Sequence, residues 1–236
     1  MKIRNLLVMA AFLMLFSCAE KRANPLIQNL DKSWIVTTDT LNIKMEVDIP
    51  SVIQADMYEN GLIPHPYKSN IESQLHWIPQ HEWEYSLDFK AEDYILREDV
   101  IELVFEGLDT YADVWMNGKK ILHADNMFRT YSYDVKDIIK ETNNIKIKFY
   151  PFDKERDSLI ETYPLRFPEK YAVMRKAAYQ NGWDWAPRYM NMGIWQPVYL
   201  KAWTRSTICS ASVITKEIHD DKADLFFEAR IDANVE

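Results

Sequence analysis

The 236-residue sequence is poor in glycine and has no surplus of basic residues. Only five glycines occur, while 13% of the residues are aromatic, which argues against a disordered or low-complexity chain. The formal net charge is −8, and acidic and basic residues are interspersed without forming a basic stripe. This charge pattern argues against a nucleic-acid partner, and a neutral ligand is expected instead.

Motifs for cofactors, metals and catalysis are also missing. No run of the GxGxxG type and no internal repeat is present, so no cofactor is expected. Spacing alone does not exclude a Ser-His-Asp triad, but no nucleophile-elbow glycines support one. The histidines lack the spacing of metal ligands and no cysteine accompanies them, which predicts no metal. They are His65, His76, His81, His123 and His219.

The one long apolar run, Leu6 to Phe16, is too short for a comfortable membrane span. Lys2 and Arg4 precede it, and Cys18 follows it. This arrangement resembles a bacterial lipoprotein signal, in which the cysteine is acylated and becomes the new N-terminus. The resemblance implies a signal peptide over residues 1–18, a lipidated Cys18, and a location in a bacterial cell envelope, periplasmic or anchored in the outer membrane. An ordinary cleaved secretory peptide is the alternative.

Cysteine is nearly absent, with only Cys18 and Cys209 in the chain. If Cys18 carries lipid, Cys209 has no partner for an internal disulfide. Cys209 follows Ile208 in a segment rich in strand-forming residues, so we expect it to be buried and inert.

Short segments that alternate apolar and polar residues make up much of the chain. Tyr85 to Phe89 and Ile145 to Phe149 both alternate with a period of two, the pattern of half-buried strands. Asn117-Gly118 tolerates positive φ at both positions, which predicts a tight hairpin turn. Many short strands with little helix predict an all-β fold, a jelly-roll-type β-sandwich over residues 26–204 that follows a tether at residues 19–25.

Two segments depart from the strand pattern. Residues 51–60 fit a helical period, and Gly61 follows where a C-terminal cap belongs, so a short helix is predicted. Residues 151–174 lack periodicity and carry Pro164 and Pro168, which predicts a long surface excursion. Because loops of this length are often functional and this one leads into a tryptophan-rich segment, we expect it to serve the site.

The character of the chain changes at residues 205–236. A strand pattern at Val213–Thr215, a charged turn at His219–Lys222 and alternating apolar residues from Leu225 to Ile231 predict the opening hairpin of another β domain. The sequence stops at Glu236 before any further strand pattern, so the hairpin is expected to lack its pairing partners.

Trp183, Asp184 and Trp185, called the Trp-Asp-Trp loop below, form the candidate binding site. Indole faces pack on the C–H faces of a pyranose, and a carboxylate accepts hydrogen bonds from paired hydroxyls, so this combination suits a sugar. On a strand, however, Trp183 and Trp185 would share a face and both would be core residues, with Asp184 in solvent. Residue types alone favour this packing alternative.

Motifs around this loop and earlier in the chain form a recognisable set. They are Arg175-Lys176-Ala177, Gly182-Trp183-Asp184-Trp185-Ala186-Pro187, Gly193-Ile194-Trp195, Ile49-Pro50, Gly61-Leu62-Ile63-Pro64, Pro66-Tyr67, Asn70-x-Glu72 and Phe105 to Val114. The set resembles the N-terminal sugar-binding domain of glycoside hydrolase family 2 β-mannosidases, which usually have Gly where this chain has Ala186. The resemblance covers residues 26–236, and it implies that residues 205–236 begin an immunoglobulin-like domain.

The resemblance also implies which residues act. In this family the loop contacts the terminal sugar, so Trp183, Asp184 and Trp185 are expected to bind substrate. Retaining glycosidases need two carboxyl groups about 5 Å apart. The family carries both as glutamates on a (β/α)8 barrel that would follow residue 236, so we expect no catalytic residue in this chain and no activity from it alone. Asn70-x-Glu72 is interpreted as a loop-ordering element and not as the catalytic Asn-Glu pair.

The chain is therefore interpreted as the N-terminal portion of a β-mannosidase that hydrolyses non-reducing terminal β-D-mannose residues in glycans. Its expected partners are a β-mannoside glycan, the downstream barrel of the same polypeptide and, through the lipid anchor only, a membrane. Two alternatives stay open: a stand-alone, non-catalytic carbohydrate-binding lipoprotein, and a family 2 hydrolase acting on another β-glycoside. The unpaired hairpin favours the N-terminal portion over the stand-alone module.

Overall fold

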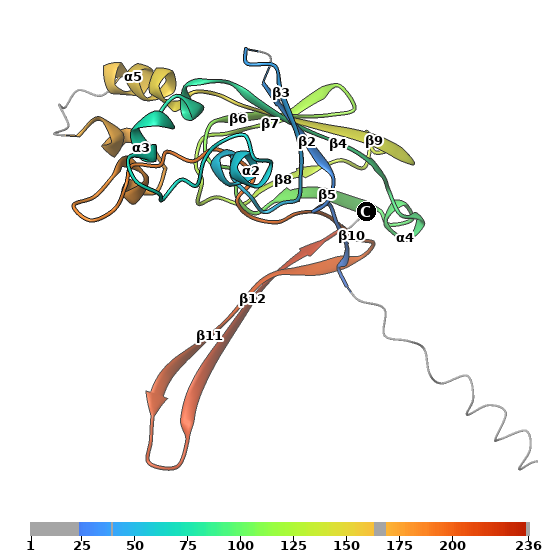
Figure 1. Ribbon diagram of the computed structural model, residues 1–236. Coiled ribbons are helices and arrows are strands. Elements are labelled where there is room, and N and C mark those ends of the chain that lie inside the picture. The colour runs from blue at the N-terminus through green and yellow to red at the C-terminus, as the bar shows by residue number, and fades with distance from the viewer. Residues whose placement is uncertain (1–23, 39, 163–168, 235–236) are drawn as a thin grey trace, which may run out of the picture.

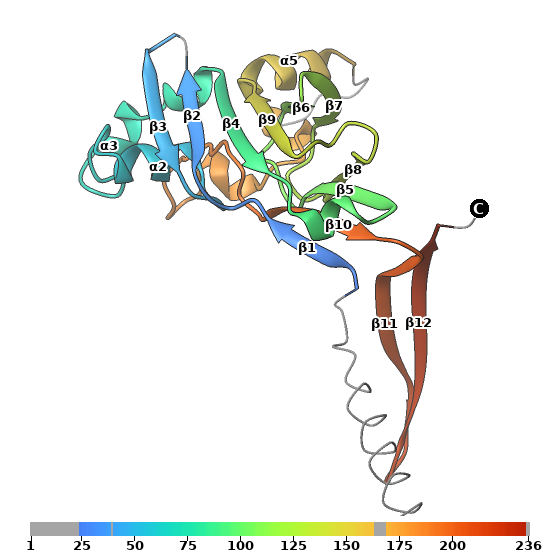
Figure 2. The same ribbon diagram turned by 90° about the vertical axis from the view of Figure 1, so that its right-hand side faces the viewer.

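The computed structural model of the protein describes residues 24–38, 40–162 and 169–234. Two antiparallel sheets form a β-sandwich, which confirms the predicted all-β, jelly-roll-type fold (Figures 1 and 2). The six-stranded sheet has the order β3 (Ile43–Val47), β2 (Trp34–Thr38), β4 (Trp83–Lys90), β9 (Thr142–Phe149), β6 (Ala112–Met116) and β7 (Lys119–Ala124). The four-stranded sheet has the order β1 (Leu26–Asn29), β10 (Val198–Trp203), β5 (Val100–Phe105) and β8 (Tyr131–Asp134).

The hydrophobic core lies between the sheets and follows the period-two pattern of the strands. In β4, Trp83, Tyr85 and Leu87 are buried and the residues between them are half-buried. Tyr85 meets Phe149 of β9 edge to face, with 5.5 Å between ring centroids. Fully burying one large apolar side chain stabilises a fold by about 1.5–3 kcal/mol, so a few such positions account for much of the net stability.

The hairpin that joins β6 and β7 turns at Asn117-Gly118, as predicted. φ is 52° at Asn117 and 81° at Gly118, in the left-handed region that these two residue types tolerate best. Asn117 Nδ2 donates to the Ile138 carbonyl at 2.8 Å, and Asn117 Oδ1 accepts from the Asn144 N–H at 2.9 Å. The turn residue therefore also ties the hairpin to β9.

Short helices gather at one end of the sandwich (Figure 1). α2 (Ile53–Glu59) confirms the helix predicted over residues 51–60, and Gly61 follows it with a φ of 69°. α2 itself lies nearer the middle of the molecule in Figure 1. The helices at the end are α3 (Ile71–Gln74), η1 (Ile78–Gln80), α5 (Phe152–Thr162), η2 (Lys170–Val173) and η3 (Ala178–Asn181), whereas α4 (Asp93–Leu96) lies at the opposite end.

α5 corrects the prediction of an excursion without helical periodicity over residues 151–174. Phe152 is the one buried residue of this helix, so it presents no apolar stripe that a sequence pattern would reveal. Arg156 forms an ion pair with Asp153 three positions earlier, and pairs with this spacing stabilise exposed helices. Residues 163–168 of the predicted excursion lie outside the described residues.

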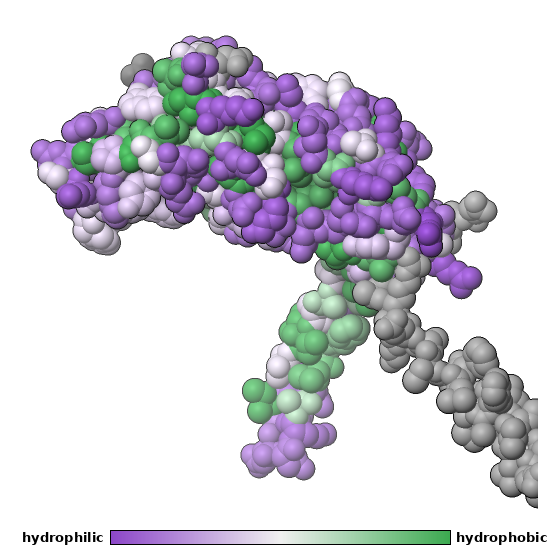
Figure 3. Space-filling view, turned by 45° about the vertical axis from the view of Figure 1, so that its right-hand side comes forward, coloured by the Kyte–Doolittle hydropathy of each residue, from purple (hydrophilic) through white to green (hydrophobic). Residues whose placement is uncertain are grey.

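β11 (Ser206–Ile218) and β12 (Ala223–Ala233) form a separate two-stranded hairpin that projects away from the sandwich (Figures 1 and 2). This confirms the predicted hairpin, while its assignment to an immunoglobulin-like domain stays a prediction. Its apolar side chains are exposed and give the hairpin a largely hydrophobic surface (Figure 3). They are Ile208, Val213, Ile214, Ile218, Leu225, Phe226, Phe227 and Ile231.

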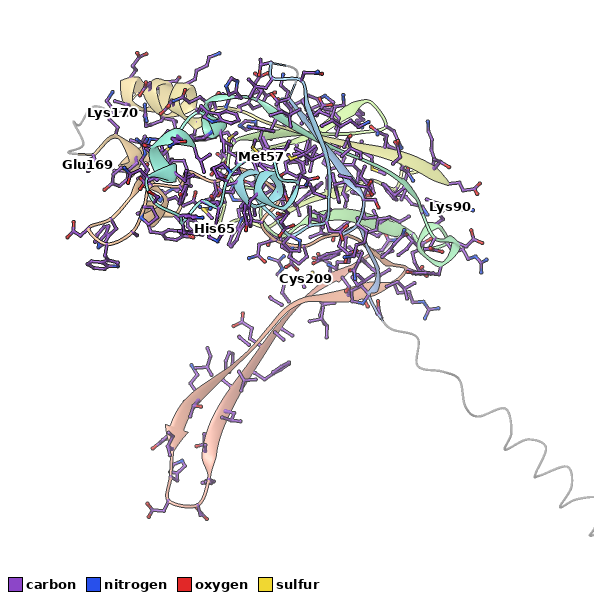
Figure 4. All side chains as sticks on the ribbon, viewed as in Figure 1. Met57, His65, Lys90, Glu169, Lys170 and Cys209 are labelled. Carbon is purple, nitrogen blue, oxygen red and sulfur yellow. The ribbon has the colours of Figure 1, made fainter. Side chains whose placement is uncertain are left out.

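Cys209 lies near the base of this hairpin (Figure 4). The prediction that Cys209 is buried is wrong, because its side chain is partly exposed and its thiol donates to Asp232 Oδ2 at 2.8 Å. The physical reason is that the hairpin projects from the sandwich instead of packing on it.

The predicted signal peptide with Cys18, and residues 19–23 of the predicted tether, lie outside the described residues. Within the ranges that the structure describes, no helix combines the length and the apolar character needed to cross a membrane.

Candidate binding site

The Trp-Asp-Trp loop follows η3 at the end of the sandwich where the short helices gather (Figure 1). It closes a tight turn, in which the Trp183 N–H donates to the Ala186 carbonyl at 3.1 Å and the Ala186 N–H donates to the Trp183 carbonyl at 3.2 Å. Gly182 before the turn has a φ of 93°, which favours glycine. Asp184 and Trp185 consequently form the tip of the turn.

Both indoles project from this turn. Trp183 is 55% exposed and Trp185 is 83% exposed, and their rings meet edge to face with centroids 6.1 Å apart. Asp184 is exposed and forms no hydrogen bond or ion pair with another residue of the described ranges. The packing alternative is therefore wrong for this chain: neither indole belongs to its core, and two aromatic faces and a carboxylate are free to meet a ligand.

A buried ion pair fixes the base of the loop. Lys176 Nζ lies 2.5 Å from Asp109 Oδ1, and each side chain is only 1% exposed. Burial lowers the pKa of the Lys176 ammonium, and the adjacent Asp109 carboxylate counteracts this effect. Lys176 Nζ also donates to the Asn191 carbonyl at 2.5 Å. Because Lys176 precedes the loop and Asn191 follows it, one side chain holds both ends of the loop against the sandwich.

Gln180 completes this buried network. Its Nε2 donates to Asp109 Oδ2 at 3.0 Å, and its Oε1 accepts from the Asn191 N–H at 2.9 Å. The Thr110 hydroxyl donates to Asp109 Oδ1. The main chains of Asp109 and Gly193 exchange two further hydrogen bonds, at 2.9 and 3.0 Å. A buried network with this many partners satisfied is rigid, so it can position the exposed turn above it.

A second set of contacts holds the outer side of the loop. Glu72 Oε1 accepts from the Arg188 N–H at 2.8 Å, which confirms the loop-ordering role predicted for Glu72. The Tyr189 hydroxyl donates to the Pro66 carbonyl, and the Tyr189 ring meets Tyr67 edge to face with centroids 5.4 Å apart. The chain that leaves the loop is thereby attached to the segment between α2 and α3.

The start of α2 packs directly against the chain that follows the loop. The Ser51 N–H donates to the Ile194 carbonyl and the Ile53 N–H to the Met192 carbonyl, both at 2.9 Å. Gly193 lies between these acceptors with a φ of 146°, and a Cβ added there would lie 2.9 Å from the Ser51 carbonyl oxygen. Only glycine permits this close approach.

Asp56 lies on the buried face of α2, at its junction with β4. It accepts hydrogen bonds from the Ser51 hydroxyl and, at 3.1 Å, from the Tyr85 hydroxyl. Burial raises the pKa of Asp56 to about 6, and the two hydroxyl donors oppose this rise. A carboxyl group that titrates near neutral pH therefore lies behind the element that supports the loop.

The sequence identified the loop but not the ion pair that holds it. Asp109 and Lys176 both lie in the motifs quoted above, but no pattern shows that two residues 67 positions apart form a pair. The available signal was the position of Asp109 directly after the apolar Leu108, since a charge that becomes buried requires a partner.

One group of side chains in the described part of the chain has the proximity of metal ligands. Glu217, His219 and Asp224 place ligand atoms within 4.8 Å of one another at the turn of the β11–β12 hairpin, away from the loop. His219 Nε2 lies 3.0 Å from Asp224 Oδ2, so a hydrogen bond accounts for part of this proximity. We assign no metal to this exposed cluster.

The fold is that of an all-β sandwich domain that presents an exposed aromatic loop. Residues 29–196 match the family described as "Glycosyl hydrolase 2 galactose-binding domain-like". The chain belongs to this family.

Named relatives narrow the assignment. The chain is 29% identical over 187 residues to a β-mannosidase of Mus musculus, covering 74% of this chain and 21% of the relative. It is 31% identical over 182 residues to β-mannosidase A of Emericella nidulans, covering 72% of this chain and 19% of the relative. It thus spans about a fifth of the length of these relatives.

A solved structure supports the same assignment. The crystal structure of a β-D-mannosidase from Dictyoglomus thermophilum has a TM-score of 0.82 at 30% identity, over 88% of this chain and 26% of that one. The comparisons confirm the resemblance to the N-terminal domain of family 2 β-mannosidases.

Proposed function

We propose that the chain is the N-terminal portion of a β-mannosidase, and that the whole enzyme hydrolyses non-reducing terminal β-D-mannose residues in glycans. The observation that carries the proposal is the exposed Trp-Asp-Trp loop on its buried ion pair, in a chain 29% and 31% identical to two proteins named as β-mannosidases.

In this proposal the loop recognises the terminal sugar. The Asp184 carboxylate accepts hydrogen bonds from two neighbouring hydroxyls, and the faces of Trp183 and Trp185 pack on the C–H groups of the ring. The buried network below the loop supports this role, because a loop held in place before binding loses little conformational entropy when the sugar arrives.

We place the catalytic step outside this chain. Retention of configuration requires an acid and a nucleophile, two carboxyl groups about 5 Å apart on either side of the scissile bond. We propose that two glutamates on a following (β/α)8 barrel supply them and that residues 205–236 begin an intervening immunoglobulin-like domain. The share of the curated relatives that the chain covers, 21% and 19%, supports a large further part.

We also propose that Cys18 is lipidated and that the protein is a bacterial cell-envelope lipoprotein. The support is the order of two basic residues, a short apolar run and a cysteine at the N-terminus. Expression of Cys18→Ala followed by membrane fractionation tests this, because the variant should move to the soluble fraction. Unchanged membrane association would contradict lipid anchoring.

The test of the proposed activity is a substrate panel with the full-length protein. Aryl β-mannoside, β-galactoside and β-glucuronide are compared at equal concentration, and the 236-residue chain is assayed beside the full-length protein. The proposal predicts hydrolysis of the β-mannoside by the full-length protein and no turnover by the chain. Preference for another glycoside would contradict the mannose assignment, and sugar binding without any hydrolysis would indicate a stand-alone binding module.

A further inference from the structure

A groove of about 550 Å³ opens directly beside the Trp-Asp-Trp loop. Its walls come from four places: η3, the loop with the residues after it, α2 with the residue before it, and the segment around His65 (Figure 4). We call it the aromatic groove; its lining residues are Val52, Gln54, Ala55, Tyr58, His65, Pro66, Tyr67, Tyr179, Gln180, Trp185, Ala186, Pro187, Tyr189 and Asn191. Its volume lies within the range of about 300–1,000 Å³ typical of small-molecule sites.

Aromatic rings dominate this lining. Tyr58 meets His65 edge to face with centroids 5.1 Å apart, and His65 meets Tyr67 in the same way at 6.2 Å. Edge-to-face contacts leave ring faces uncovered, and Tyr67 is 74% exposed. Trp185 and Tyr179 add two further exposed rings. The groove therefore offers several apolar faces at different angles.

The aromatic groove contains no charged partner for a charged ligand. None of its described lining residues is Lys, Arg, Asp or Glu, although 27% of the whole chain is charged. Its polar groups are side-chain amides, tyrosine hydroxyls and the His65 imidazole. Asn191 has no side-chain hydrogen bond within the described residues, and Gln54 is 6% exposed with its Oε1 lacking a partner there. The half-buried Asn191 amide can therefore pair with a neutral ligand in the groove, whereas Gln54 Oε1 is shielded from solvent.

We propose that the aromatic groove binds the neutral sugar units next to the terminal one, on its reducing-end side. Aromatic faces combined with amides and hydroxyls match the alternating C–H faces and hydroxyls of a neutral oligosaccharide. An enzyme that removes the non-reducing terminal sugar has no room for sugars beyond that end. The remaining sugars of the substrate therefore extend from the site on the reducing-end side. Trp185 belongs to both the loop and the groove, which makes the two sites continuous. The inference rests on the proposed β-mannosidase function.

The kinetic test compares a small leaving group with a sugar leaving group. The kcat/KM of the full-length protein is measured for β-1,4-mannotriose and for an aryl β-mannoside, and the ratio of the two is the readout. Tyr67→Ala and Tyr58→Ala should each lower this ratio about three- to tenfold, since one aromatic contact contributes about 0.5–1.5 kcal/mol. Tyr67→Phe keeps the ring and should keep most of the ratio.

Tyr94→Ala is the matched control, because Tyr94 is an exposed tyrosine on α4 at the opposite end of the sandwich. Its ratio should equal that of the unmodified protein. Ratios unchanged in both Tyr67→Ala and Tyr58→Ala, with hydrolysis intact, would overturn the groove proposal while leaving the proposed function standing.

A different measurement tests the groove if the full-length protein proves not to be a β-mannosidase. If the full-length protein hydrolyses no β-mannoside, mannotriose is not consumed and its equilibrium binding can be measured by saturation-transfer NMR. Binding that is lost in Tyr67→Ala and retained in Tyr94→Ala would support the groove as an oligosaccharide site without the enzyme. Absence of binding, or binding unaffected by Tyr67→Ala, would overturn it.

Discussion

The buried ion pair between Lys176 and Asp109 is expected both to stabilise the fold and to hold the Trp-Asp-Trp loop in position. Removing one partner leaves the other charge buried without compensation, which costs about 3–5 kcal/mol in proteins. We predict that Lys176→Met lowers the free energy of unfolding by an amount in this range, measured by denaturant titration. Lys32→Met, which breaks the exposed pair with Asp48, is the matched control and should change little.

A small effect of Lys176→Met, equal to that of Lys32→Met, would contradict the role of the buried pair. The circular dichroism spectrum of Lys176→Met separates local loosening of the loop from loss of the sandwich, because only the latter removes the strand signal.

Because of Asp56, we predict that the free energy of unfolding decreases as the pH rises. Its pKa rises from 3.8 to about 6 on folding, so the folded protein favours the protonated form. The stability that it contributes is complete below about pH 4 and is lost as the pH rises through 6. Since one pKa unit corresponds to about 1.4 kcal/mol, the loss is roughly 3 kcal/mol.

We expect Asp56→Asn to remove this decline. Denaturant unfolding at several values between pH 4 and pH 7 should show the unmodified protein losing stability relative to the variant as the pH rises. Carboxyl groups with lowered pKa, such as Asp113, act in the opposite direction at lower pH and are common to both proteins. Parallel stability curves across this window would show that Asp56 does not titrate there.

At the scale of the element, the Trp-Asp-Trp loop depends on Glu72. Glu72→Ala removes the acceptor of the Arg188 N–H, and a single hydrogen bond of this kind contributes about 0.5–3 kcal/mol. Local opening should therefore increase, and hydrogen exchange in residues 183–189 should become faster while exchange in β4 stays unchanged. Glu72→Gln retains an acceptor oxygen and is the control. Equal exchange in Glu72→Ala and the unmodified protein would show that other contacts suffice.

We predict that the 236-residue chain self-associates through the β11–β12 hairpin. Its strands carry exposed apolar residues, with Val213 paired opposite Phe227, and an open edge of this kind is a template for pairing with other chains. Phe227→Lys should shift the 236-residue chain toward monomer in sedimentation velocity. Ser212→Lys adds the same charge on the same hairpin without removing an apolar side chain, and should shift it less. A monomeric unmodified chain with strong exchange protection at residues 225–231 would contradict the prediction.

Elements with a repeating burial pattern were predictable from the sequence, and elements without one were not. β4 and β9 bury alternate residues, so their period appears in the sequence, and Asn117-Gly118 specifies its turn by backbone conformation. α5 buries only Phe152 and therefore carries no period. The loop was predicted as a binding site through the family resemblance of its motifs, whereas its residue types alone favoured packing. The ion pair that holds the loop could not be predicted, because Asp109 and Lys176 are far apart in sequence and only the tertiary fold brings them together.

For the whole molecule, the sandwich acts as a rigid support that presents one loop and one groove at the same end. The aromatic residues of the groove come from α2, from the segment before α3, and from η3, the loop and the residues after it. All of them are exposed except the half-buried Tyr189, and single exposed aromatics are common. Only the fold shows that they share one neutral surface, so the groove was not accessible to sequence reasoning.

The central claim is that Asp184 binds the terminal sugar, and the kinetics of Asp184→Ala in the full-length protein test it most directly. Loss of a charged acceptor leaves sugar hydroxyls unpaired at about 1–3 kcal/mol or more, so kcat/KM on an aryl β-mannoside should fall roughly ten- to several-hundred-fold. The unfolding midpoint should stay unchanged because Asp184 is exposed, and Asp221→Ala on the hairpin turn is the matched control. Near-normal kcat/KM in a well-folded Asp184→Ala protein would contradict the account.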